Sequence, residues 1–216
     1  MRNLFLDLKI KKELKRFKKF KETYDFKLKE IEEKEDGSLF CEGICLREGA
    51  DGSLVGETEN FVNSNYMLHG YKYSKVISNL FPYKFYFKGH KIACAESVFQ
   101  ALKFKTPKLQ KLVFEYEALN ANRIKGCAEY DWTVSGKVYF LGKEMNRDSK
   151  EYEDFIDELY VSLIQNPLFV QALKNVGNRY ILHSIGVEDK SKTTFTRTEF
   201  EKELNTIKDY VLSKTK

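Results

Sequence analysis

The first part of the chain carries a helical pattern of apolar positions. Residues 3–34 contain neither proline nor glycine, which favours one long helix over this range. Apolar side chains recur at alternating intervals of four and three residues, interrupted by a charged residue at Lys21: Ile10, Leu14, Phe17, Tyr24, Leu28 and Ile31. Because the repeat covers only about three heptads, we expect this face to pack on the protein's own body, with a partner helix as the alternative.

Turn signals follow this segment. The dipeptides Asp36-Gly37 and Asp51-Gly52 predict turns. Between them, residues 38–46 read as a strand, and residues 53–56 could return as its hairpin partner. We therefore place a domain boundary near residue 60, with an N-terminal extension over residues 1–60 and a main domain over residues 61–216.

Short strands and capped helices make up the main domain. Tyr83–Phe87 reads as a strand followed by a turn and a returning segment, and residues 137–141 read as another short strand. Four helix starts are visible as capping residues or capping boxes: Thr106-Pro107, Asp148–Glu151, Asn166-Pro167 and Thr196–Glu199. Strands and helices do not alternate regularly, so we expect an α+β fold that is mainly helical. The glycine-rich loops of nucleotide-binding folds are absent from the sequence.

Composition narrows the class of protein. A hydrophobic content of 42% is enough to bury a core, and no apolar run approaches the roughly 18 residues needed to span a bilayer. The N-terminus does not read as a secretory signal, so we expect a soluble cytoplasmic protein. The cysteines lack paired spacing, and the chain has only three histidines; we expect free thiols, no metal site and no cofactor.

The positive charge is concentrated at the N-terminus. Residues 1–34 hold 12 Lys and Arg against 7 Asp and Glu, whereas the remaining residues hold 25 of each sign. A basic helix can attract nucleic acid, so nucleic acid is a candidate partner of this segment. The simpler alternative is a solvated helix surface. A third hypothesis is that the helix mediates an interaction such as homodimerisation.

A polar stripe stands out on the segment that begins at Ala95. Glu96, Gln100 and Lys103 lie at i, i+4 and i+7, which places them on one side of a helix, whereas the apolar residues Val98, Phe99 and Leu102 should face the core. A carboxylate, an amide and an ammonium group in a row could serve as an acid/base, an orienting group and a phosphate clamp. On spacing alone, a solvated polar face is the alternative.

Residues around this stripe match a known pattern. Ser78-Asn79-Leu80-Phe81-Pro82 precedes an aromatic strand, and Glu96-x-x-Phe99-Gln100-Ala101-x-Lys103-Phe104 follows it. Looser matches lie downstream, at Ala121–Gly126, Asp131-Trp132 and Asn166–Leu173. Over roughly residues 61–190, the sequence resembles the NADAR (YbiA-like) family, so the resemblance implies that fold for the main domain.

The resemblance implies an N-glycosidase that hydrolyses a bond between a ribose and a nitrogen. The implied substrates are ADP-ribose on a guanine base or, alternatively, phosphorylated ribosylaminopyrimidine intermediates of riboflavin synthesis. Glu96 is then the catalytic carboxylate, which stabilises an oxocarbenium-like transition state. The implied substrate-binding residues hold phosphate, ribose or base: Asn79, Gln100, Lys103, Arg123 and Trp132. The alternative for Trp132, the only tryptophan, is a core anchor.

The end of the domain departs from the family pattern. Ser97 replaces the histidine that usually follows the signature glutamate, and the terminal D-x-x-W-G-x-G element is missing. His183 stands where the family often has a glutamate, and Glu188 or Asp189 is the nearest match to its aspartate. We expect Asp189 as the second catalytic carboxylate and His183 as a substrate-binding residue; the alternative for His183 is a hydrogen-bonded structural residue. The departure also motivates a second hypothesis, a non-catalytic module that binds ADP-ribose or another nucleotide.

Overall fold

The computed structural model places helices and small sheets along most of the chain. It describes residues 4–26, 31–36, 39–41, 44–48, 54–55, 67–68, 71–72, 77–117, 132–178, 180–181, 183 and 187–215. The expected domain boundary near residue 60 and the turn at Asp51-Gly52 lie outside these residues.

The N-terminal helix is shorter than its sequence pattern predicts. Helix α1 spans Leu4–Thr23, and strand β1 (Ile31–Glu33) occupies the end of the range expected to be helical. The prediction of a helix to residue 34 is therefore wrong. The physical reason lies further along the chain, because β1 pairs antiparallel with β2 (Leu39–Cys41) and its backbone groups bond across that hairpin.

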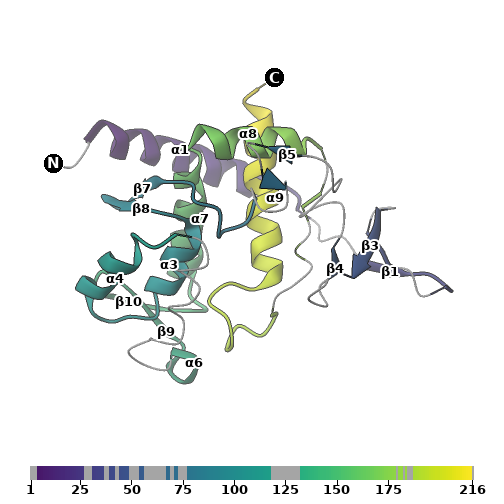
Figure 1. Cartoon of the computed structure of the whole chain (residues 1–216). Coiled ribbons are helices and arrows are strands. Elements are labelled where there is room, and N and C mark those ends of the chain that lie inside the picture. Colours follow the sequence, from purple (N-terminus) through teal and green to yellow (C-terminus); the bar gives the residue numbers. More distant parts are fainter. Residues whose placement is uncertain are drawn as a thin grey trace.

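The extension forms a small antiparallel sheet. Its strand order is β1-β2-β3-β4, with β3 at Ile44–Glu48 and β4 at Leu54–Val55. The pairing of β4 with β3 confirms the expected hairpin return. The single strand expected over residues 38–46 is wrong, because β2 and β3 lie within that range and pair with each other in antiparallel fashion. Figure 1 shows this sheet to one side of the helical body. A further two-stranded pair joins β5 (Met67–Leu68) and β6 (Tyr71–Lys72).

Two hairpins and three short helices open the main body. The hairpins are β7 (Phe85–Phe87) with β8 (His90–Ile92), and β9 (Lys137–Phe140) with β10 (Lys143–Asn146). The short helices are α3 (Ala95–Ala101), α4 (Pro107–Val113) and α6 (Trp132–Ser135). The strands near residues 83–94 and 137–141 were expected from the sequence and are confirmed.

Three longer helices follow, and the caps of α8 and α9 agree with the sequence, whereas α7 begins one residue later than the capping box expected at Asp148–Glu151. Helix α7 spans Lys150–Leu163 with Ser149 as its N-cap, and α8 spans Pro167–Val176 with Asn166 as its N-cap. Helix α9 spans Arg197–Ser213 and begins with a complete capping box between Thr196 and Glu199. These helices therefore start where side-chain acceptors satisfy their first backbone N–H groups.

Helix α7 organises the core. It packs against α1, α9, β7 and β10, as the central position of α7 in Figure 1 illustrates. Its Phe155 ring meets Phe87 at 5.1 Å and Phe140 at 5.0 Å between ring centroids, both edge to face. Aromatic contacts of this kind contribute about 0.5–1.5 kcal/mol each beyond the area they bury.

Helix α1 packs on the body with the face predicted from its apolar spacing. Phe17 is fully buried in the core, and Leu14 packs against it. Full burial of a side chain of this size contributes about 1.5–3 kcal/mol. The expectation that this face packs on the protein's own body is therefore confirmed for α1. Tyr24, the next apolar position of the pattern, directly follows α1 and is half-buried, and Leu28 lies outside the described residues.

The architecture is mixed, mostly helical, with small antiparallel sheets. The expectation of an α+β chain that is mainly helical holds at this level. Over the described part of the chain, none of the helices has the length and apolar character that a membrane span requires.

Candidate functional site

The start of α3 is hydrogen-bonded to the segment that precedes the β7–β8 hairpin. Cys94 is extended and buried, and the Ser97 hydroxyl donates to its carbonyl oxygen at 2.7 Å. The Glu96 N–H donates to the carbonyl oxygen of Asn79 at 3.0 Å. This bond satisfies one of the N–H groups that the first turn of a helix leaves unpaired, and it places Asn79 beside Glu96.

The stripe predicted from Glu96 to Lys103 is a connected row of hydrogen bonds, although α3 ends at Ala101 and Lys103 lies in the turn that follows it. The Gln100 amide donates from Nε2 to Glu96 Oε1 at 2.6 Å, and Lys103 Nζ donates to Gln100 Oε1 at 2.9 Å. Gln100 is only 5% exposed, whereas Glu96 and Lys103 are half-buried. The row is therefore not a freely solvated helix face. A buried amide fixes a carboxylate at one end and an ammonium group at the other.

This row can act on a molecule that carries both a developing positive charge and an anion. The Glu96 carboxylate can stabilise a cationic centre or accept a proton, and the Lys103 ammonium can hold phosphate or carboxylate oxygens. Because the Gln100 amide bonds to both side chains at once, it restricts their rotamers without needing a ligand. Preorganised charges of this kind contribute more to catalysis than mobile ones.

Tyr160 supports the row from α7, and sequence reasoning missed it. Its hydroxyl donates to Asn79 Oδ1 at 2.9 Å, and its side chain is fully buried. Burial raises the pKa of Tyr160 well above its ordinary value, and the nearby carboxylates of Glu203 and Glu96 raise it further. Tyr160 is therefore a neutral hydrogen-bond donor that orients the Asn79 side chain. Only a long-range contact between residues 79 and 160 could have revealed it.

An aromatic cluster links this region to the segment before α9. The Phe195 ring stacks on Phe99 of α3 at 4.8 Å and lies 5.7 Å from the Tyr160 ring. Phe200, the next ring, lies 6.2 Å from Phe195 and 4.4 Å from the ring of His183. Through these rings, the structure brings His183 into the neighbourhood of α3 and α7.

The backbone of His183 is held by a buried carboxylate. Glu201 accepts from the His183 N–H at 2.8 Å and from the Tyr180 hydroxyl at 3.0 Å. Burial raises the pKa of Glu201, and both hydrogen bonds oppose that rise. Glu201 was not among the expected site residues, because a glutamate inside an amphipathic helix carries no signal of burial.

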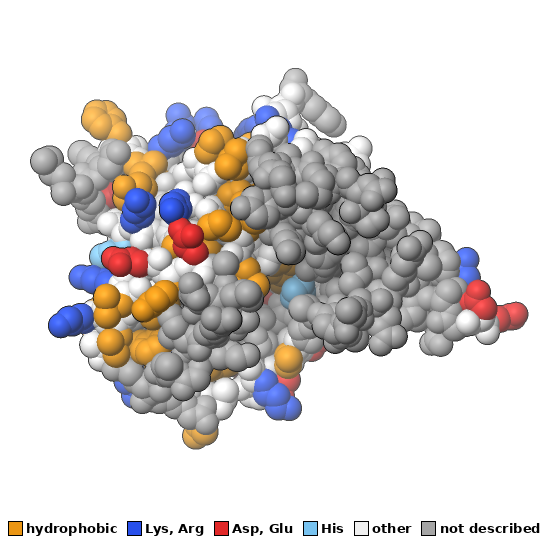
Figure 2. All heavy atoms as spheres, viewed as in Figure 1, with side chains coloured by type: hydrophobic (Ala, Val, Ile, Leu, Met, Phe, Trp, Pro, Cys, Tyr) orange, Lys and Arg blue, Asp and Glu red, His pale blue; other side chains and the backbone are white. Residues whose placement is uncertain are grey.

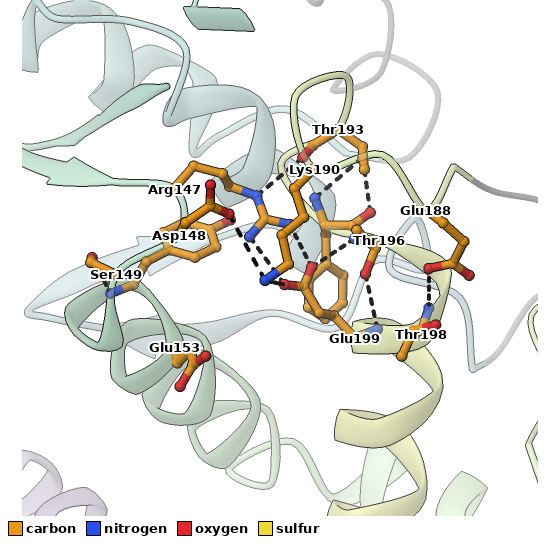
Figure 3. A network of polar contacts seen from close by, with 12 residues as sticks. Arg147, Asp148, Ser149, Glu153, Glu188, Lys190, Thr193, Thr196, Thr198 and Glu199 are labelled. Carbon is orange, nitrogen blue, oxygen red and sulfur yellow. Dashed lines mark hydrogen bonds and ion pairs between the residues drawn. The ribbon is translucent and has the colours of Figure 1, made fainter. Parts of the chain in front are cut away.

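A buried arginine fixes the segment that carries Phe195. Arg147 is 2% exposed and bonds to both carboxylate oxygens of Glu199, from Nη1 at 3.0 Å and from Nη2 at 2.5 Å. Its Nε donates to the Thr193 carbonyl at 3.1 Å. Figure 3 shows this guanidinium pointing between Thr193 and Glu199, with Lys190 nearby. A bidentate pair of this kind sets geometry as well as energy, so Arg147 positions the segment relative to α9.

The structure does not bring the expected second carboxylate to the row. Asp189 is exposed; it accepts from the Ser191 hydroxyl at 2.6 Å and pairs with Lys192 at 3.2 Å. Glu188, the other candidate, pairs with Arg197 at 2.8 Å beside the start of α9. These contacts hold Asp189 in a surface turn, and none of them is with Glu96, Gln100 or Lys103.

The remaining expected binding residues divide into two cases. Trp132 is 6% exposed and belongs to the hydrophobic core, which matches the core-anchor alternative and leaves no open ring face for a base. Arg123 lies outside the described residues. Within the described part, no group of three His, Cys, Asp or Glu side chains is arranged as a metal site would require.

A separate cavity lies between the β7–β8 hairpin and α4. Its volume is about 470 Å³, and none of the expected site residues lines it; the lining residues are Lys84, His90, Lys91, Ile92, Ala93, Lys111, Phe114, Glu115 and Glu117. Figure 2 shows hydrophobic and charged side chains side by side on the surface over α4. The cavity carries both signs of charge, and Lys84 pairs with Glu117 at 2.9 Å.

Comparison with known proteins identifies a different family from the one that the motifs suggested. The family described as bacteriophage protein GP30.3 matches residues 70–209, well over half of the chain. The resemblance to the NADAR family is therefore wrong as a family assignment. A physical reason is that Phe99, Ala101 and Phe104 are buried, so core packing of a short helix explains much of the matched pattern. No curated protein and no solved structure matches this chain.

Proposed function

We propose that this chain, which belongs to the bacteriophage GP30.3 family, hydrolyses a bond between a ribose and a nitrogen. In this reaction, the bond between C1′ and the nitrogen breaks with its electron pair on the nitrogen. Water adds its hydroxyl to C1′, and its proton passes to the leaving nitrogen. The transition state carries positive charge on the ribose ring.

The observation that carries the proposal is the hydrogen-bonded row that begins on α3 at Glu96 and ends at Lys103. Glu96 is half-buried, and Gln100 bonds to one of its oxygens at 2.6 Å. The carboxylate can therefore keep a fixed orientation toward a ribose and accept the proton of the attacking water. Stabilisation of transition-state charge by a fixed group typically contributes about 3–4 kcal/mol.

Lys103 supports a phosphorylated substrate. Its ammonium group lies at the far end of the row, 2.9 Å from Gln100 Oε1, and could hold phosphate oxygens while Glu96 faces the ribose. ADP-ribose on a guanine base is the first substrate that we propose, and a phosphorylated ribosylaminopyrimidine is the second. We propose that the reaction takes place in the cytoplasm.

A single substitution tests the role of Glu96. Glu96→Gln keeps an oxygen for the Gln100 amide but removes the negative charge, so we expect release of ADP-ribose from a modified guanine oligonucleotide to fall at least about 100-fold. Glu115→Gln is the matched control, because Glu115 is an exposed carboxylate beyond the end of α4. Equal release by the parent and Glu96→Gln would remove Glu96 from the reaction.

A second candidate is a module that binds a phosphorylated nucleotide without cleaving it. The placement of Asp189 favours it, because this carboxylate bonds to Ser191 in a surface turn and not to the row. Calorimetry with ADP-ribose, followed by mass analysis of the ligand after long incubation, distinguishes the candidates. Tight binding of ADP-ribose, with modified guanine recovered intact, favours the module.

A further inference from the structure

We propose that the exposed face of α1 binds the phosphodiester backbone of nucleic acid. Helix α1 holds eight Lys and Arg residues against three Asp and Glu residues. The basic residues that are exposed form a set that we name the α1 basic face: Lys9, Lys11, Lys12, Lys15, Arg16 and Lys19. No exposed acidic residue lies between Lys9 and Lys19.

The α1 basic face is continuous. With about 100° of rotation per residue, its six members fall within one half of the helix circumference, and Phe17 falls on the opposite half. From Lys9 to Lys19, the helix rises about 15 Å, a length over which duplex DNA carries about nine negative charges. The six cations, of which Arg16 also pairs with Glu13 at 2.8 Å, could neutralise more than half of this charge.

The rest of the molecule does not share this charge. Residues 35–216 hold equal numbers of basic and acidic residues, and the net charge of +5 belongs to residues 1–34. A localised positive field on a neutral body orients an approaching polyanion toward that surface. Attraction to nucleic acid would therefore be directed to α1.

Buried polar contacts hold α1 in place. Lys21 reaches Asp157 at 2.6 Å and Glu203 at 2.5 Å, and the Tyr210 hydroxyl donates to Glu13. Together with the buried Phe17, these contacts dock the inner face of α1 on α7 and α9. The α1 basic face is thus presented by a helix whose orientation is set by the body.

The same docking favours nucleic acid over a lipid surface. A helix that binds a membrane inserts its apolar side chains between lipids. In α1, the apolar face packs on the core through Leu14 and Phe17, and the large hydrophobic residues that remain exposed are Phe5 and Leu8. Phosphate contacts need only the cations, which face outward.

The test compares two triple variants of the full chain. Lys12→Gln/Lys15→Gln/Lys19→Gln removes three charges from the α1 basic face, and Lys108→Gln/Lys174→Gln/Lys202→Gln removes three charges from exposed positions of α4, α8 and α9. Fluorescence anisotropy with labelled single-stranded and duplex DNA gives the association constant between about 50 and about 200 mM salt.

We expect the α1 variant to lose more than tenfold in affinity at the lowest salt, and the control variant to lose little. The slope of log association constant against log salt should become less steep by about 2 for a single strand or about 3 for a duplex. Equal losses in both variants, no binding of DNA by the parent, or tighter binding to vesicles of anionic lipid would overturn the proposal. Because binding is measured without turnover, the result does not depend on Glu96.

Discussion

Lys21 on α1 and Glu203 on α9 form an ion pair of 2.5 Å between residues 182 positions apart in the sequence. Lys21 also reaches Asp157 on α7 at 2.6 Å, so one ammonium group joins three helices. Glu203 is 6% exposed, and its second oxygen, Oε2, has no hydrogen-bond partner among the described residues. The docking of α1 therefore places a charge cluster in the interior.

Removal of the ammonium group should destabilise the fold. Lys21→Met keeps the length of the side chain but leaves Glu203 and Asp157 together without a cation. We expect the free energy of unfolding at pH 8 to fall by about 3 kcal/mol, measured by denaturant titration. Lys19→Met is the control, since the same substitution at an exposed site two residues away should cost less than about 0.5 kcal/mol. Equal effects would show that the pair does not hold α1.

The same cluster predicts how stability depends on pH. Burial raises the pKa of Glu203 to about 7, although the charge of Lys21 lowers it. Between about pH 4.5 and 7, the folded protein keeps a proton that the unfolded chain releases, so the free energy of unfolding should decrease as pH rises through this window. Above pH 7, Glu203 is ionised in both states, and its contribution no longer changes.

Glu203→Gln isolates this effect. The variant has no titrating group at position 203, so its stability should depend less on pH in this window, by up to about 3 kcal/mol. Glu201, whose pKa burial also raises, remains in both proteins and does not affect the difference. Identical pH profiles for the parent and Glu203→Gln would contradict the assignment.

Local signals were predictable from the sequence, and long-range contacts were not. The caps at Asn166-Pro167 and Thr196–Glu199 involve residues only a few positions apart, so the residue types alone predict where α8 and α9 begin. The predicted end of α1 was wrong because a long-range contact decides it. Ile31 pairs with Cys41, and that strand pairing outweighs the local helix propensity.

In the candidate site too, the local spacing was predictable from the sequence and the long-range contacts were not. The spacing of Glu96, Gln100 and Lys103 predicted a row, and hydrogen bonds now connect it. The spacing could not show that Gln100 is buried, because burial depends on what packs above α3. Tyr160 supports Asn79 across 81 residues, and periodicity carries no information at that distance.

Loss of the Tyr160 hydroxyl should affect the row more than the fold. Tyr160→Phe removes the donor to Asn79 Oδ1, so we expect about 1 kcal/mol of lost stability and about tenfold slower release of ADP-ribose. Tyr210→Phe is the control, because that hydroxyl bonds to Glu13 on α1. Its loss should lower stability and leave release unchanged. If both variants slow release equally, Tyr160 has only a structural role.

Replacement of Arg147 should loosen the segment that carries Phe195. Arg147→Lys keeps the charge but cannot reach both oxygens of Glu199 and the Thr193 carbonyl together. We expect about 2 kcal/mol of lost stability and faster hydrogen exchange of the amides at residues 189–196. Arg197→Lys is the matched control, since its pair with Glu188 is partly exposed and should contribute less than about 1 kcal/mol.

Tyr83 offers a substitution that should stabilise the protein. Its side chain is 3% exposed and its hydroxyl has no hydrogen-bond partner among the described residues, whereas its ring packs 4.6 Å from Phe81. Tyr83→Phe keeps the ring and removes a buried unpaired group, so the free energy of unfolding should rise by about 1 kcal/mol in denaturant titration. Tyr152→Phe, which breaks a bond to the Thr194 carbonyl, should lower it by a similar amount. A loss in Tyr83→Phe as large as in Tyr152→Phe would mean that the Tyr83 hydroxyl is paired in solution.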